Sequence, residues 1–112
     1  MSAAPSQPLP PLLVAVDEVV TSWPDVRGKN VFGHRGWVCS GTMLGFVAET
    51  GVAVKALSEQ HSAELYARTG VQPFFYNGTM EMKGWPVIPV VSEGDVSDAL
   101  SELQRVYDAV TR

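Results

Sequence analysis

Cys39 is the only cysteine in the chain, and it is the first side chain to consider as a nucleophile. A catalytic cysteine needs a lowered pKa and a base within reach. His34 and His61 are the only histidines, so they are the candidate bases. Cys39 lies within an apolar run, where a small buried side chain is expected, so we interpret it as a packing residue. One cysteine and two histidines without paired spacing also do not form a metal-ligand set. We expect no catalytic residue, no metal and no cofactor.

Basic side chains gather just before Cys39, with no acidic residue between Arg27 and Arg35. This cluster, which also contains Lys29 and His34, could bind an anion or a phosphate backbone. A solvated loop is the more common explanation for such a cluster. Lys55, at the end of an apolar run, is a further anion-binding candidate, although a lysine at a sheet margin often only extends its amine into water. The candidate ligand-binding residues are therefore Arg27, Lys29, Arg35 and Lys55.

Aromatic side chains could in principle stack on nucleic acid bases. At strand spacing such residues more often form core, and the formal net charge of −4 opposes binding to nucleic acid or to an anionic membrane. Gly33, Gly36 and Gly41 do not form a phosphate-binding loop, because no helix follows them. The aromatic residues concerned are Trp37, Phe74, Phe75, Tyr76 and Trp85.

The chain has 112 residues, which suits one domain. We assign residues 1–10, which are rich in proline and uncharged, to a flexible tail, and residues 11–112 to a single α+β domain. No long apolar run predicts a transmembrane helix, and no basic residue precedes the first apolar run as in a secretory signal. With a single cysteine excluding an internal disulfide, these features favour a cytoplasmic location.

The segment 31–55 should be the centre of the fold. Short apolar runs separated by Ser40-Gly41 and by residues 49–51 predict three antiparallel strands in a meander. Asn77-Gly78 predicts a further hairpin. The hairpin lies within residues 73–82. Residues 85–91 form a further possible strand that contains Pro86 and Pro89, so we expect an edge strand or an irregular segment there.

Helices should cover this sheet. Proline near the start and Pro24 after the end predict a helix over 11–23, with Val16, Val19 and Val20 on its apolar face. Residues 25–30 are then a polar connection. Ser58 predicts the start of a short helix over 59–69. A heptad-like apolar stripe predicts a helix over 96–111 capped by Asp95. The expected fold is an antiparallel sheet of about five strands flanked by N- and C-terminal helices, with a short helix after the third strand.

The central pattern resembles the TfoX N-terminal domain family. The residues that carry it are Val31-Phe32-Gly33, Gly36-Trp37, Ser40-Gly41, the strand ending in Lys55, Pro73-Phe74 with Tyr76, and Met82-Lys83-Gly84-Trp85. The neighbouring YjbR-like domains are the alternative. Val31 replaces the methionine usual in the TfoX family, and His34 stands where a second glycine is common.

The resemblance implies an α+β domain related to regulators of DNA-uptake competence, without their second, C-terminal domain. We therefore expect a non-enzymatic, cytoplasmic regulatory or protein-interaction module. The apolar run 74–76 and the sparsely charged segment 85–91 favour a homodimer through a sheet edge or an exposed sheet face, and a monomer that binds a different protein is the alternative. Its protein partner is not identified by the sequence. The alternative is a small domain, binding or enzymatic, that uses Lys55 and the cluster from Arg27 to Arg35 for an anionic ligand.

Overall fold

The computed structural model describes residues 9–31 and 33–112. Its elements follow in the order α1 (Pro11–Val20), β1 (Val26–Val31), β2 (His34–Cys39), β3 (Thr42–Val47), β4 (Gly51–Val54), α2 (Glu59–Tyr66), β5 (Gln72–Tyr76), β6 (Met80–Pro89) and α3 (Glu93–Thr111). The strands form one antiparallel sheet in the order β1-β2-β3-β4-β6-β5. The α+β class expected from the sequence is confirmed, with six strands in place of about five. Most of the predicted tail, residues 1–8, and Phe32 lie outside the described residues.

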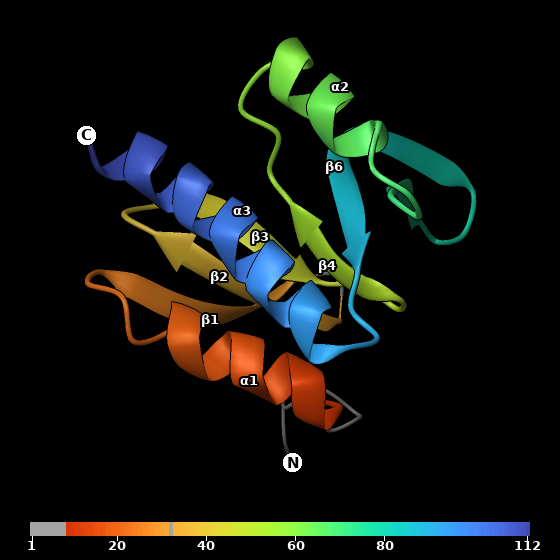
Figure 1. Cartoon of the computed structure of the whole chain (residues 1–112). Coiled ribbons are helices and arrows are strands. Elements are labelled where there is room, and N and C mark those ends of the chain that lie inside the picture. Colours follow the sequence, from red (N-terminus) through yellow and green to blue (C-terminus); the bar gives the residue numbers. More distant parts are fainter. Residues whose placement is uncertain (1–8, 32) are drawn as a thin grey trace.

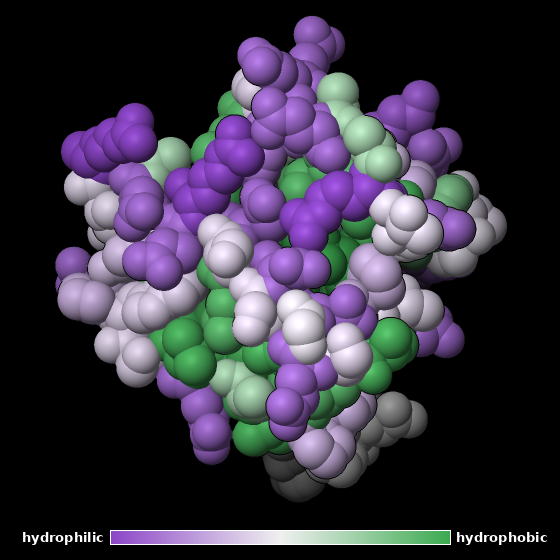
Figure 2. Space-filling view, viewed as in Figure 1, coloured by the Kyte–Doolittle hydropathy of each residue, from purple (hydrophilic) through white to green (hydrophobic). Residues whose placement is uncertain are grey.

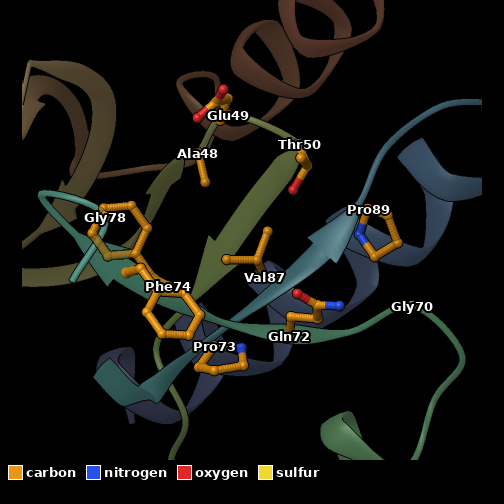
Figure 3. Close-up of a pocket in the computed structure, with 11 residues that line it drawn as sticks. Ala48, Glu49, Thr50, Gly70, Gln72, Pro73, Phe74, Gly78, Val87 and Pro89 are labelled. Atoms are coloured by element: carbon orange, nitrogen blue, oxygen red, sulfur yellow. The ribbon is translucent and has the colours of Figure 1, made fainter. Parts of the chain in front are cut away.

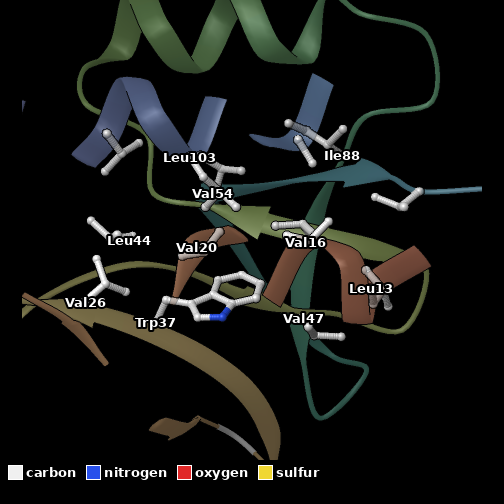
Figure 4. Close-up of a cluster of buried hydrophobic side chains, with 14 of the residues drawn as sticks. Leu13, Val16, Val20, Val26, Trp37, Leu44, Val47, Val54, Ile88 and Leu103 are labelled. Atoms are coloured by element: carbon white, nitrogen blue, oxygen red, sulfur yellow. The ribbon is translucent and has the colours of Figure 1, made fainter. Parts of the chain in front are cut away.

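The helices pack on one face of the sheet (Figure 1). α1 and α3 contact each other, α3 crosses β2 to β4, and α2 contacts β6. Apolar side chains from helices and strands form the main core between these layers (Figure 4). Alternation along β4 divides the two faces: Val52 and Val54 enter the main core, whereas Ala53 points to the opposite face. Because no described helix contributes to the core on that opposite face, we call it the open face.

The segment 25–30, expected to be a polar connection, contains most of β1. Val26 and Val31 are buried at its two ends, and the four residues between them are exposed. β1 pairs along its whole length with β2 through a hairpin near Gly33. The error has a physical cause: an edge strand buries few side chains, so its apolar alternation is weak.

β6 lies between β4 and β5, so the expectation of an edge or irregular segment at 85–91 is wrong. Pro86 is tolerated because β4 pairs only with residues 87–89 of β6. On its other side Pro86 stands opposite Pro73, next to a bulge in the pairing with β5. Pro86 therefore sits where the ladder is already interrupted, whereas Pro89 is the last residue of β6 and stands opposite Gly51.

The helix boundaries differ from the prediction at their ends. α1 stops at Val20, and Val19 is 40% exposed, so its place on the predicted apolar face is wrong. Ser92 rather than Asp95 caps α3, because the Ser92 hydroxyl accepts a hydrogen bond from the Asp95 backbone N–H. The Asp95 carboxylate in turn accepts one from the backbone N–H of Val91, so the two side chains satisfy donors on both sides of the helix start.

The hairpins and the α2 cap follow the prediction. Ser40 and Gly41 adopt positive φ angles of 50° and 84° and connect β2 to β3. Asn77 and Gly78 do the same between β5 and β6. Ser58 accepts a hydrogen bond from the backbone N–H of His61 at 3.0 Å. Such turns depend on short-range geometry, which explains why they were predictable.

Candidate functional site

Cys39 lies in the main core, completely buried. Its sulfur atom lies 4.0 Å from the Ser40 hydroxyl. Of the two histidines considered as its bases, His34 lies at the other end of β2 and on the opposite face of the sheet, and His61 lies on α2. The prediction that Cys39 packs rather than reacts therefore agrees with its burial.

His61 is also buried, with 2% of its surface exposed. Its Nδ1 accepts a hydrogen bond from the Leu57 backbone N–H at 3.0 Å, so its Nε2 carries the proton donated to the Glu102 carboxylate at 3.1 Å. Arg68 binds the second oxygen of Glu102 at 3.2 Å and also pairs with Asp98. Both ring nitrogens of His61 are thus hydrogen-bonded. Because His61 and Arg68 both bind Glu102 of α3, these contacts hold α2 against α3. The sequence did not reveal them, because the ion-paired residues are 30 to 41 positions apart in the chain.

Arg35 is separated from the other basic candidates. It points to the helix-covered face, where its Nε donates to the Asp17 carboxylate at 2.9 Å. The Trp37 indole N–H donates to the same oxygen at 2.7 Å. A Cβ atom at Gly28 would collide with the Arg35 guanidinium group. Glycine at this position therefore provides the space that the guanidinium group occupies. The cluster predicted from Arg27 to Arg35 is therefore not a single site.

Arg27 and Lys29 remain together on the open face. They alternate with Gly28 along β1, and both side chains are exposed. They border a hollow of about 470 Å³ that is also lined by Val38 and Met43. Strand alternation places His34 on the same face.

Lys55 lies farther across this face. Its amine is 5.8 Å from the centroid of the Trp85 ring, a cation–π arrangement. β2 and β3 separate β4 from β1, which corresponds to about 14 Å between backbones. Lys55 therefore does not converge with Arg27 and Lys29 on one small ligand.

The centre of the open face is aromatic. Phe46 is fully buried there and contacts Phe74 edge to face, with ring centroids 4.8 Å apart, and Trp85 at 5.4 Å. Of the aromatic residues interpreted as core, Trp37 is fully buried, and Phe74 and Trp85 are partly buried against Phe46. Trp37 belongs to the main core, whereas Phe75 and Tyr76 of β5 are 44% and 37% exposed.

A groove of about 420 Å³ lies at the β5 end of the open face (Figure 3). Val87 of β6 lies on its floor, β5 and its hairpin form one wall, and the β3–β4 loop with Glu49 forms another. Most of its lining is apolar. Two hollows thus lie on the same face, one beside the basic β1 edge and the other beside the aromatic β5 edge.

The helix-covered face has a different character. Figure 2 shows that hydrophilic side chains gather over α2 and α3, with apolar surface near α1. Acidic side chains on this face form ion pairs with arginines, as between Arg105 and Glu64 at 3.3 Å. Within the described ranges no group of three or more histidine, cysteine or acidic residues could hold a metal ion. In the same ranges, none of the helices has the length and apolar character needed to cross a membrane.

The chain matches no model of a known protein family, and no curated protein sequence matches it. The resemblance to the TfoX N-terminal domain therefore stays a prediction.

Proposed function

We propose that this chain is a non-enzymatic protein-interaction module that acts in the cytoplasm and binds through the β5 edge of its sheet. The observation that carries the proposal is the contrast between the two sheet edges. β1 carries the exposed charges of Arg27 and Lys29, and β5 carries no charged side chain. An uncharged edge strand exposes backbone donors and acceptors that another strand can pair with, whereas charge on an edge opposes such pairing.

The side chains on and beside β5 strengthen this proposal. Phe75 and Tyr76 are partly exposed, and Met80, opposite Tyr76 in the hairpin, is 61% exposed. Neighbouring exposed apolar side chains on a small domain are typical of contact surfaces. Two copies joined about a two-fold axis would place these residues against their counterparts, so we propose a homodimer through β5. A regulatory role related to the TfoX N-terminal domain is part of the proposal, supported by the shared α+β layout and turn pattern.

Light scattering over a tenfold concentration range in the micromolar region tests the dimer. We expect the mass of the wild type to rise toward two chains. Phe75→Lys should stay at one chain, because the two-fold axis brings two new like charges together. Val91→Lys is the matched control, since Val91 is an apolar residue 80% exposed away from β5. It should behave as the wild type.

A wild-type mass that stays at one chain over the whole range would exclude the homodimer. The broader module proposal is then tested by cross-linking in native lysate. It requires a partner protein that binds the wild type and Val91→Lys but is lost with Phe75→Lys. A partner retained by all three proteins would show that β5 is not the binding edge.

A further inference from the structure

Arg27 and Lys29 are a pair of neighbouring cations on one face of an edge strand. They are two positions apart on β1, so their side chains leave the same side of the sheet about 7 Å apart at the backbone. Like charges at this separation repel each other. No ion pair joins either side chain to any residue in the ranges 9–31 and 33–112. Asp25, the nearest acidic residue in sequence, borders an adjacent hollow with Arg27 but does not pair with it.

Within the described ranges, Lys55, Lys83 and Arg112 also form no ion pair, so what distinguishes Arg27 and Lys29 is their closeness on one strand. Arg35, Arg68 and Arg105 each hold at least one carboxylate. The formal net charge is −4, so acidic side chains outnumber the basic ones. Arg27 and Lys29 are thus two adjacent cations kept without a carboxylate in an acidic protein, and an anion between them would relieve their repulsion.

The hollow beside the two cations has an apolar floor. It measures about 470 Å³ and is lined by Val38 and Met43, both partly buried, together with Gly28 and Gly41. Register explains the arrangement, since Val38 stands opposite Arg27 on one side and opposite Met43 on the other. Because Gly28 and Gly41 have no side chain, they leave the hollow open. A ligand there would meet positive charge at the sheet edge and apolar surface toward the sheet centre.

We propose that Arg27 and Lys29 bind the phosphate of a small phosphate monoester whose apolar body lies on Val38 and Met43. The guanidinium group of Arg27 can donate two parallel hydrogen bonds to phosphate oxygens, and Lys29 supplies a second positive charge. This site is independent of the β5 edge, so it stands or falls apart from the proposed dimer. Arg35 and Lys55 have no part in it, because Arg35 faces the helices and Lys55 lies over Trp85.

Charge on an edge strand also protects that edge from pairing with other chains. Protection alone requires no hollow and no apolar floor. The two explanations differ in what they predict: a protective role predicts no binding of a small anion, and a site predicts binding that needs both the phosphate and the apolar body.

The test is an NMR titration of the full-length, isotopically labelled protein with phenyl phosphate, inorganic phosphate and phenol. We expect phenyl phosphate to bind more tightly than inorganic phosphate, phenol to show no saturable shifts, and the shifted amides to cluster on β1, β2 and the 40–43 segment. Arg27→Gln and Lys29→Gln should each weaken phenyl phosphate binding about two- to fivefold, the range typical of an exposed ion pair. Both residues are exposed, so neither variant should disturb folding.

Two controls separate the site from general charge. Lys83→Gln removes an exposed lysine of β6, and Arg35→Gln removes the arginine on the other face; both should leave phenyl phosphate binding unchanged. Met43→Ser should reduce the preference for phenyl phosphate over inorganic phosphate, because it removes apolar surface from the hollow. Met43 also packs against the open-face core, so circular dichroism must first show that this variant is folded.

The proposal is overturned by equal binding of phenyl phosphate and inorganic phosphate, by shifts that survive the Arg27→Gln, Lys29→Gln double variant, or by no saturable binding up to tens of millimolar. A single-stranded oligonucleotide that binds much more tightly than phenyl phosphate, with a salt dependence corresponding to more than two phosphates, would also overturn it in favour of a nucleic acid surface.

Discussion

Replacing Asp17 by alanine should destabilise the domain mainly through Trp37. One oxygen of Asp17 accepts hydrogen bonds from the Trp37 indole at 2.7 Å and from Arg35 at 2.9 Å. Trp37 is completely buried, so without Asp17 its N–H loses its partner away from water. Leaving a buried donor unsatisfied costs about 1–3 kcal/mol. The Arg35 pair is 36% exposed on the arginine side and should add only about 0–1 kcal/mol.

The expected loss for Asp17→Ala is therefore about 2 kcal/mol in the free energy of unfolding, measured by circular dichroism in urea. Asp17→Asn keeps an acceptor for the indole and should cost about 1 kcal/mol or less. Glu18→Ala, an exposed acidic neighbour on the same helix, should stay within about 0.5 kcal/mol of the wild type.

A double-mutant comparison decides whether Trp37 is the cause. In the Trp37→Phe background no indole N–H remains, so Asp17→Ala should cost less than half of its value in the wild type. If the cost is the same in both backgrounds, the hydrogen bond to Trp37 does not explain the stability contributed by Asp17. The assignment of the loss to a buried donor would then be wrong.

Two further predictions concern the core and the pH dependence of stability. Leu103 of α3 is fully buried in the main core, so Leu103→Ala should cost about 2–5 kcal/mol in urea unfolding; a loss below about 0.5 kcal/mol would contradict its place there. The pKa of Tyr66 is raised in the folded state, first by burial and then by the negative charge of Glu81, and its neutral hydroxyl donates to the Lys83 carbonyl at 2.8 Å. Folding thus favours the protonated phenol, so this stabilisation is complete below about pH 10, the ordinary pKa, and is lost as pH rises through the folded-state pKa. The stability difference between the wild type and Tyr66→Phe should therefore shrink above about pH 10, and a difference that grows there would refute the assigned direction.

Local signals in the sequence determined the fold class and most element positions. The Ser40-Gly41 and Asn77-Gly78 turns, the Ser58 cap and the apolar stripe that includes Leu103 each depend on residues close together in the chain. Their conformations follow from steric limits on φ and from helical spacing, which no distant contact needs to supply. Even Cys39 could be assigned to packing from its place in an apolar run.

The tertiary structure decided which candidate residues act together. Arg27, Lys29 and Arg35 look equivalent in the sequence, yet Asp17 on α1 holds Arg35 on the helix-covered face and leaves the other two on the open face. β6 pairs with β4 although α2 and β5 lie between them in the sequence. This pairing places β5 at the second edge of the sheet. Strand order and long-range ion pairs depend on contacts between residues far apart in the chain, so local patterns do not specify them. The two surfaces proposed for binding, the basic hollow and the β5 edge, exist only because of those contacts.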